Sequence, residues 1–139
     1  MNPKILLIDD DRAVLTVYEE TLAEVGFSVV ACRTREEAEG ALDRDGPWDV
    51  VILDEKLRGP GGPATATDLL PVIAAKAPGA RTIVITGFAT PTLARSAVAA
   101  GAWDYLTKDS DLLTVLLPLR VQHAVEAANE ARLRGVTGT

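Results

Sequence analysis

The sequence has few of the residues that many functional sites require, and it has no long apolar segment. Its 139 residues include one cysteine, one histidine and two each of Trp, Tyr and Phe. A single cysteine, Cys32, cannot form a disulfide within the chain, which is typical of a reducing compartment. No apolar run approaches the ~18 to 20 residues of a membrane span, and the start Met-Asn-Pro-Lys lacks the apolar core of a signal peptide. These absences predict a cytoplasmic protein.

Basic residues are also in the minority. The chain has 14 Lys and Arg against 20 Asp and Glu, a formal net charge of −6, which argues against nonspecific attraction to nucleic acid or to anionic membranes. With 47% hydrophobic and 24% charged residues, the composition is that of a globular protein with an aliphatic core. The length predicts one domain, which we place at residues 1–134, followed by a flexible tail or linker stub at 135–139.

Two apolar runs each end in acidic residues. Residues 5–8 (ILLI) lead directly into Asp9, Asp10 and Asp11, and residues 50–53 (VVIL) lead into Asp54. Continuous apolar runs of this length are typical of strands buried on both faces of a parallel sheet. Neighbouring carboxylates repel one another, so a cluster of them needs a cation, hydrogen-bond donors or solvent to stay ionised. A hard divalent ion such as Mg²⁺ fits best, although Asp9 to Asp11 could instead cap a following helix.

Strand and helix patterns alternate along the chain, which predicts an α/β fold with helices on both faces of a parallel sheet. The predicted strands lie at 4–8, 27–32, 49–54, 81–86 and 103–107, and the predicted helices at 12–26, 34–43, 68–76, 90–101 and 115–133. Between the third strand and the third helix is a long segment, 55–67, rich in Gly and Pro, which we expect to be the most mobile loop. The predicted fold class is a doubly wound (βα)5 unit with the flavodoxin-like strand order 2-1-3-4-5.

In that strand order the acidic strand ends become neighbours. Ligands of open α/β sheets bind at the carboxyl ends of the strands where the order reverses, here between the first and third strands. Asp9, Asp10 and Asp54 should therefore lie together, with Thr86 and Lys108 at the ends of the adjacent strands. A cation site, a carboxylate nucleophile, a hydroxyl and an ammonium group are the parts that phosphoryl transfer to an aspartate requires.

The motifs ILLIDDD, DVVILDEKL, IVITGFA and GAWDYLTK resemble those of the receiver domains of two-component response regulators, and the resemblance covers nearly the whole chain. It implies that Asp54 accepts a phosphoryl group from the phosphohistidine of a sensor histidine kinase or a histidine phosphotransfer protein. The implied cofactor is Mg²⁺. Its ligands would be Asp10 and Asp54, Asp9 directly or through water, and the backbone carbonyl of Lys56.

The resemblance also implies a switch. Thr86 would hydrogen-bond the new phosphoryl group, Lys108 would pair with it, and Tyr105 would turn inward as the threonine moves. The surface around the fourth helix, fifth strand and fifth helix would then carry the signal, and it could also form a homodimer. Such a protein is a phosphoryl-accepting regulator rather than an enzyme, although it assists its own phosphorylation and slow dephosphorylation. Taken alone, Thr86 and Lys108 could be ordinary strand-end residues, and Tyr105 a core residue.

The sequence departs from the family pattern at several positions near the site. Asp109 replaces the proline that usually follows the lysine through a cis peptide, and Arg58 replaces a proline four residues after the acceptor. Lys56 and Phe88 occupy positions that border the path of hydrolytic water in this family. We therefore predict that the bulky Phe88 slows dephosphorylation.

Two other functions are compatible with the same motifs. A receiver-like binding module could signal without phosphorylation, an alternative suggested by the altered Lys108-Asp109 junction. A metal-dependent phosphohydrolase could use Asp54 as its nucleophile, but no separate general acid or substrate-recognition motif accompanies it. Accumulation of a phosphoprotein favours the receiver, whereas turnover of a simple phosphate ester favours the hydrolase.

Overall fold

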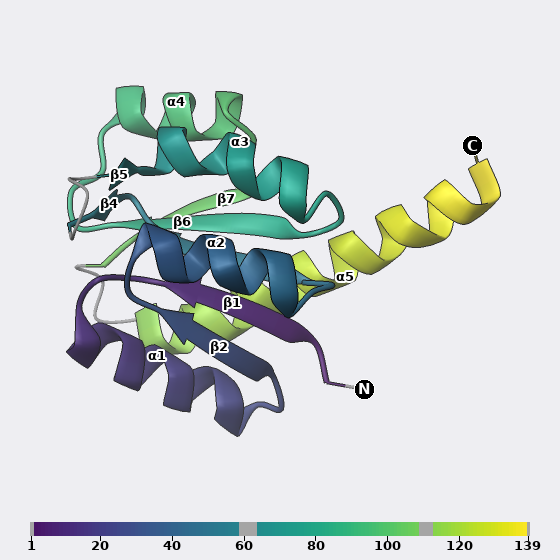
Figure 1. Ribbon diagram of the computed structural model, residues 1–139, viewed down its shortest axis with the longest axis horizontal. Coiled ribbons are helices and arrows are strands. Elements are labelled where there is room, and N and C mark those ends of the chain that lie inside the picture. The colour runs from purple at the N-terminus through teal and green to yellow at the C-terminus, as the bar shows by residue number, and fades with distance from the viewer. Residues whose placement is uncertain (1, 59–63, 109–112, 139) are drawn as a thin grey trace.

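Alternating strands and helices build a parallel sheet with helices on both of its faces (Figure 1). The computed structural model describes residues 2–58, 64–108 and 113–138. The strands are β1 (Lys4–Ile8), β2 (Ser28–Cys32), β3 (Val50–Asp54), β4 (Lys56–Leu57), β5 (Ala64–Thr65), β6 (Arg81–Thr86) and β7 (Asp104–Thr107). The helices are α1 (Arg12–Glu24), α2 (Arg35–Arg44), α3 (Ala66–Lys76), α4 (Pro91–Ala99) and α5 (Leu113–Gly138).

The main sheet has five strands in the order β2-β1-β3-β6-β7. Every neighbouring pair in it is parallel, so all five carboxyl ends lie at one edge. Because β6 and β7 are the fourth and fifth strands of this sheet, the order is the predicted 2-1-3-4-5. The predicted α/β fold class is therefore confirmed.

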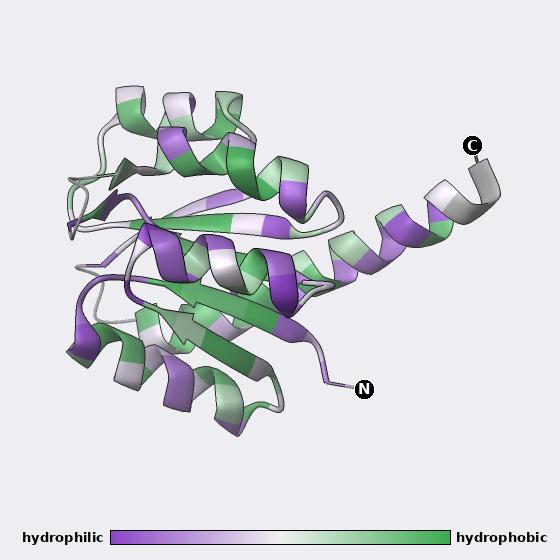
Figure 2. Ribbon diagram, viewed as in Figure 1, coloured by the Kyte–Doolittle hydropathy of each residue, from purple (hydrophilic) through white to green (hydrophobic). Residues whose placement is uncertain are grey.

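Each face of the sheet carries its own apolar core. One core joins the sheet to α1 and α5, and includes Leu22 and Leu117, which are fully buried. The other joins it to α2, α3 and α4, and includes Trp48, Leu69 and Ala97. The hydropathy of the ribbon follows this arrangement, since the central strands are apolar and the helices alternate between apolar and polar residues (Figure 2). A strand between two cores needs apolar residues on both sides, which explains the unbroken runs in β1 and β3.

The segment after β3 differs from the predicted loop. Residues 56–57 and 64–65 form an antiparallel two-stranded ribbon, with Lys56 opposite Thr65, and α3 begins two residues before its predicted start. Residues 59–63, the centre of the predicted mobile loop, lie outside the described residues. The ribbon fixes where the chain leaves and re-enters the region beside Asp54.

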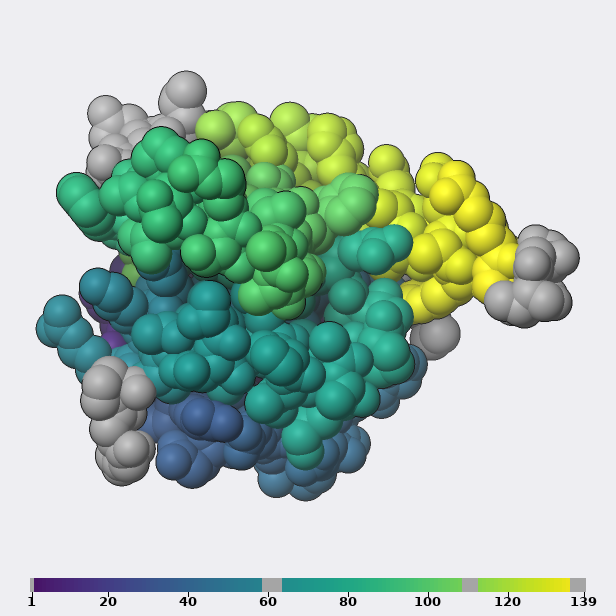
Figure 3. All heavy atoms as spheres, turned by 90° about the horizontal axis from the view of Figure 1, so that it is seen from above, coloured from purple at the N-terminus to yellow at the C-terminus, as the bar shows by residue number. Residues whose placement is uncertain are grey.

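The last helix is longer than predicted and projects beyond the body of the domain (Figures 1 and 3). It reaches Gly138, five residues past its predicted end, and so includes most of the segment that the sequence assigned to a tail. Near its end, the Arg132 guanidinium donates to Asp49 Oδ1 at 2.7 Å and to the Trp48 carbonyl at 3.0 Å. These bonds attach α5 to the chain just before β3. Among the described residues, no helix combines the length and apolar character needed to cross a membrane.

Candidate functional site

The register of the parallel strands places the predicted site residues at the same edge of the sheet. In the β1–β3 pair Ile8 lies opposite Leu53, so the next residues, Asp9 and Asp54, are neighbours. In the β3–β6 pair Asp54 lies opposite Ile85, so Thr86 follows at the same edge. The side chains converge because each lies at, or directly after, the last residue of its strand.

Lys108 completes the site from β7. Thr86 and Thr107 are paired in the sheet, and the Lys108 backbone N–H donates to the Thr86 carbonyl at 2.7 Å. Its ammonium group lies 2.8 Å from Asp9 Oδ2 and 3.2 Å from Asp54 Oδ1. Burial disfavours the charged form of Lys108, but the hydrogen bond to Asp9 and the charges of Asp54 and Asp9 outweigh it and raise its pKa. Lys108 is thus held as a cation between two buried carboxylates.

Asp54 is the most strongly perturbed acid of the site. Burial raises the pKa of its carboxyl to about 6, and the Asp9 charge acts in the same direction, while Lys108 partly opposes both. The backbone N–H groups of Asp11 and Arg58 donate to Asp9 Oδ1 and Asp10 Oδ2, at 2.9 and 2.8 Å. These donors and Lys108 orient the acids but leave an excess of negative charge.

The acids also form a group that fits a divalent cation. Each of Asp9, Asp10 and Asp54 offers a carboxylate oxygen, and these atoms lie within 4.8 Å of one another. Oxygen donors of this kind suit Mg²⁺, which is commonly held by one or two carboxylates together with phosphate and water. The donor set therefore agrees with the predicted metal. The assignment of the Lys56 carbonyl as a further ligand remains a prediction; this residue begins β4, two positions after Asp54.

Of the two predicted switch residues, Thr86 ends β6 at the same edge as Asp54, and Tyr105 lies in β7 and contacts Glu55, the residue after Asp54. The Thr86 hydroxyl accepts from the Phe88 backbone N–H at 3.1 Å and is within 3.2 Å of the Phe88 carbonyl, to which it donates. The Tyr105 hydroxyl donates to Glu55 Oε2 at 2.5 Å. Burial and the hydrogen bond and charge of Glu55 raise the pKa of Tyr105 to about 12, against the opposing effect of the nearby Thr86 hydroxyl. Glu55 is therefore the main partner of the Tyr105 hydroxyl.

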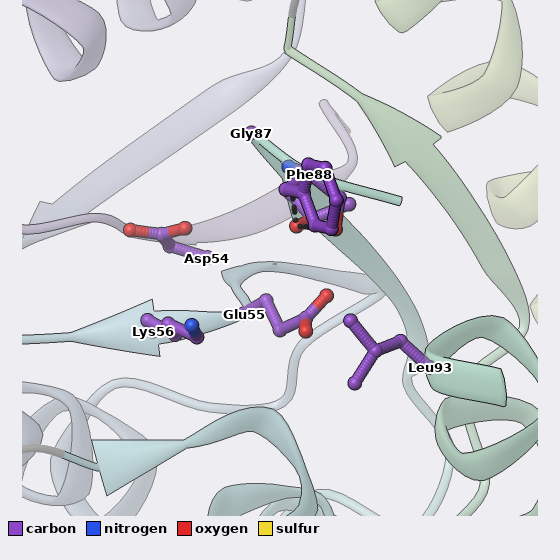
Figure 4. A pocket seen from close by; sticks show the side chains of 7 residues that line it. Asp54, Glu55, Lys56, Gly87, Phe88 and Leu93 are labelled. Carbon is purple, nitrogen blue, oxygen red and sulfur yellow. Dashed lines mark hydrogen bonds between the residues drawn. The ribbon is translucent and has the colours of Figure 1, made fainter. Parts of the chain in front are cut away.

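An open cavity of about 180 Å³ lies beside the acceptor strand, lined by Asp54, Glu55, Lys56, Thr86, Gly87, Phe88 and Leu93. In Figure 4 the side chains of Asp54 and Glu55 extend in different directions, and that of Glu55 reaches toward Leu93. Phe88 is 76% exposed at the cavity. This space gives a reacting group access to one side of Asp54.

Several other predictions can be compared with the structure. Asp11 caps α1, since its Oδ1 accepts from the backbone N–H groups of Ala13 and Val14. His123, the one histidine of the sequence, is exposed on α5. Asp109, which replaces the family's proline after Lys108, lies outside the described residues.

Sequence reasoning missed Glu55. It is 8% exposed and binds Tyr105, 50 positions away in the chain. The sequence shows only that Glu55 directly follows the acceptor. That position does not predict a contact with a tyrosine from another strand.

Comparisons with known proteins agree with this geometry. The sequence model of the response regulator receiver domain matches residues 5–117. The alginate biosynthesis transcriptional regulatory protein AlgB of Pseudomonas aeruginosa is 33% identical over 105 residues, which cover 76% of this chain and 22% of that protein. The response regulator protein PilR of the same organism is 32% identical over 138 residues, covering 95% of this chain and 30% of that protein. The chain thus spans less than a third of the length of these relatives.

Solved structures share the fold. A CheY-like response regulator receiver domain protein from Methanospirillum hungatei superimposes with a TM-score of 0.82 at 24% identity, covering 94% of this chain and 99% of that one. NtrX from Brucella abortus gives a TM-score of 0.86 at 24% identity, covering 97% of this chain and 30% of that one. Both likenesses extend over nearly all of the chain.

Proposed function

Because this chain belongs to the response regulator receiver domain family, we propose that Asp54 accepts a phosphoryl group from the phosphohistidine of a histidine kinase or histidine phosphotransfer protein. The observation that carries the proposal is the setting of Asp54: its carboxylate ends β3, lines an open cavity and contacts Lys108 at 3.2 Å. In the reaction an Asp54 oxygen bonds to phosphorus as the phosphorus–nitrogen bond to histidine breaks, and the electron pair of that bond remains on the imidazole. The protein is a signalling domain, not an enzyme with a turnover of its own.

Three acids would hold Mg²⁺ for this transfer: Asp10, Asp54 and, directly or through water, Asp9. The metal supplies charge neutralisation at the transferred phosphoryl oxygens. Lys108 adds a second positive charge on the β7 side. Since the ammonium group already contacts both Asp9 and Asp54, it can remain beside the acceptor while the phosphoryl group arrives.

Phosphorylation changes the charge around Thr86 and Tyr105. A phosphoryl group adds roughly 1.5 to 2 negative charges and three acceptor oxygens. The Thr86 hydroxyl, now bonded to the Phe88 backbone, ends β6 next to the residue that pairs with Asp54, and it could exchange its partner for a phosphoryl oxygen. That exchange would release the start of the segment leading to α4.

The signal would leave through the surface of α4, β7 and α5. This surface includes exposed apolar residues, namely Val98, Trp103, Val115 and Leu119, with 47 to 68% exposure. We propose that it contacts a partner or a second copy of the chain, which light scattering with and without phosphodonor would test. A rise in mass on phosphorylation, lost in Val115→Glu, would support the homodimer; an unchanged monomer would exclude it.

The first experiment tests phosphorylation itself. The purified protein is incubated with Mg²⁺ and acetyl phosphate and weighed intact by mass spectrometry, beside Asp54→Asn. One phosphoryl adduct that requires Mg²⁺ and is absent from the variant is the expected result. If neither acetyl phosphate nor a panel of histidine kinases produces an adduct, the proposal fails and a phosphorylation-independent binding module becomes the better description.

A further inference from the structure

Glu55 is a buried acid whose backbone is fixed on both sides. Its N–H donates to the Ile85 carbonyl at 2.9 Å, and its own carbonyl accepts from the Ala66 N–H at 2.8 Å. The residue is therefore tied to β6 and to the first residue of α3. A backbone held in this way fixes the direction in which the side chain leaves the chain, and its carboxylate reaches away from Asp54 (Figure 4).

The carboxylate reaches the hydroxyl of Tyr105 on β7. The distance from the hydroxyl to Glu55 Oε2 is 2.5 Å, at the short end of the range for a hydroxyl that donates to a carboxylate, a charge-assisted bond about twice as strong as a neutral one. Glu55 is 8% exposed, so water competes weakly for its carboxylate. The pair thus joins the residue after the acceptor to the edge strand of the sheet.

The backbone of Tyr105 is held as well. Its backbone N–H donates to Asp104 Oδ1 at 2.8 Å, and Asp104 Oδ2 binds Arg120 of α5 at 2.8 Å. The ring packs against the core on the α2, α3 and α4 side of the sheet. All these contacts come from side chains and backbone of this chain, so none of them requires a phosphoryl group.

Thr86 lies near Tyr105, but its own hydrogen bonds go to another part of the chain. Its hydroxyl both accepts from and donates to the backbone of Phe88, within the segment that follows β6. Glu55 contacts Tyr105 through a charged group, whereas Thr86 can offer only a neutral hydroxyl. The stronger of the two contacts is therefore independent of where the Thr86 hydroxyl points.

We propose that Glu55 sets the position of Tyr105. The tyrosine side chain then lies against Glu55 and the core both before and after Asp54 is phosphorylated. This inference concerns the regulation of the site and rests on the proposed phosphoryl acceptance. Phosphorylation then acts chiefly on Thr86, Phe88 and the start of α4, while Tyr105 is a fixed part of the output surface.

Fluorine NMR can test this because the chain has only two tyrosines. The protein is labelled with 3-fluorotyrosine in a Tyr18→Phe background, which leaves one resonance, from Tyr105. Glu55→Met removes the acceptor but keeps the length of the side chain. Glu55→Gln is the matched control, since it removes the charge but keeps a carbonyl acceptor. Circular dichroism checks folding, and Glu55→Ala replaces Glu55→Met if that variant does not fold.

In the absence of phosphodonor, Glu55→Met should move the Tyr105 resonance at least half of the way to its position in urea-unfolded protein. The difference in its chemical shift between H₂O and D₂O, which grows with exposure to solvent, should also increase. Glu55→Gln should keep it near the position in the parent protein. A resonance that stays in place in Glu55→Met would overturn the proposal, because Tyr105 would then be held by something else.

The second arm adds Mg²⁺ and acetyl phosphate to the same samples, with the adduct on Asp54 followed by intact mass. The parent resonance should stay in place as the adduct accumulates, and that of Glu55→Met should move back toward it. If the parent resonance moves with the adduct, Tyr105 follows the phosphoryl group and the inference is wrong. If no adduct forms, the proposed function fails, but the comparison without phosphodonor still decides whether Glu55 holds Tyr105.

Discussion

Lys108 is the cation that lets two carboxylates lie side by side at the edge of the sheet. Its ammonium group contacts both Asp9 and Asp54, yet one positive charge cannot balance these two acids and Asp10. The remaining negative charge favours either protonation or a metal ion. In the absence of metal, the site therefore lowers the stability of the fold near neutral pH.

Asp54→Asn should raise the free energy of unfolding of the metal-free protein at pH 7. The fold raises the pKa of this carboxyl from 3.8 to about 6, so the neutral form is the one that stabilises the fold. Its contribution is present below the unfolded pKa and is lost as the pH rises through about 6. We expect a gain of about 1 to 3 kcal/mol in urea titrations with EDTA, since one pKa unit corresponds to ~1.4 kcal/mol.

This gain should shrink as the pH falls toward 4.5, where the native Asp54 carboxyl is itself protonated. Glu19→Gln is a suitable control because it removes an exposed carboxylate from α1, and it should change stability little at either pH. If Asp54→Asn and the parent protein were equally stable at pH 7, the ionised Asp54 carboxylate would not destabilise the metal-free fold, and the prediction would be wrong.

Phe88 lies at the opening of the cavity beside Asp54 and is 76% exposed. Phe88→Ala should shorten the lifetime of the phosphoryl group several-fold, because a smaller side chain lets water approach the phosphorus more easily. The decay of the adduct after removal of phosphodonor, followed by intact mass, measures this. Leu93→Ala, which enlarges the same cavity farther from Asp54, is the control, and an unchanged lifetime in Phe88→Ala would show that Phe88 does not limit water.

At the scale of residues, the sequence predicts those side chains whose position depends on the strand alone. Asp9, Asp54 and Thr86 end apolar runs, so the parallel register places them together without further information. The partner of Glu55 could not be predicted in this way. Its contact with Tyr105 depends on how the chain bends between β3 and β4 and on the position of β7, which leaves no pattern in the sequence.

Among the elements, α5 is held to the domain at a point far along its length. Arg132 joins it to Asp49 and to the Trp48 carbonyl, next to the amino end of β3. The guanidinium can make these bonds because it presents several donors in a fixed plane. The final turns of α5 should therefore be more ordered than their exposure alone suggests.

Arg132→Ala should loosen the end of α5. We expect a loss of about 0.5 to 1 kcal/mol in the free energy of unfolding, because the side chain is partly exposed and its bonds compete with water. Deuterium exchange of the peptide covering 126–138 should rise more than that of any other peptide. Arg134→Ala is the control: its contact with Glu130, at 3.6 Å, joins two well-exposed side chains. Equal exchange in the two variants would mean that Arg132 does not anchor the helix.

The elements that sequence patterns missed are those with weak local signals. β4 and β5 have two residues each, too few to show an alternation of apolar and polar residues. The length of α5 was underestimated because Gly135 has a low helix propensity. Gly26 and Gly101, by contrast, were expected to end helices, and they have φ values of 95° and 112°, a conformation that favours glycine.

The whole molecule is a sheet between two separate cores, with the acidic site at the edge where the strands end. The acids depend on the fold for their proximity, since they come from distant parts of the chain. A ligand that binds all of them together should therefore stabilise the native state and not the unfolded chain.

Mg²⁺ should raise the free energy of unfolding of the protein by about 1.4 kcal/mol at a concentration ~10 times its dissociation constant. Thermal unfolding with increasing MgCl₂, against NaCl at equal ionic strength, measures this effect. Asp10→Asn should lose most of the increase, because it removes a proposed ligand. Equal stabilisation of the variant and the parent protein would show that the ion binds elsewhere.

One buried strand connects the two ends of the domain. β3 is buried at all five residues and ends at Asp54, while Asp49, just before its start, binds Arg132 of α5. Over a length of about 17 Å, the strand has no loop in which movement could be absorbed. Its amides should therefore exchange with deuterium in one cooperative opening. A change in the local stability of β3 should then affect both the contact with the end of α5 and the position of Asp54.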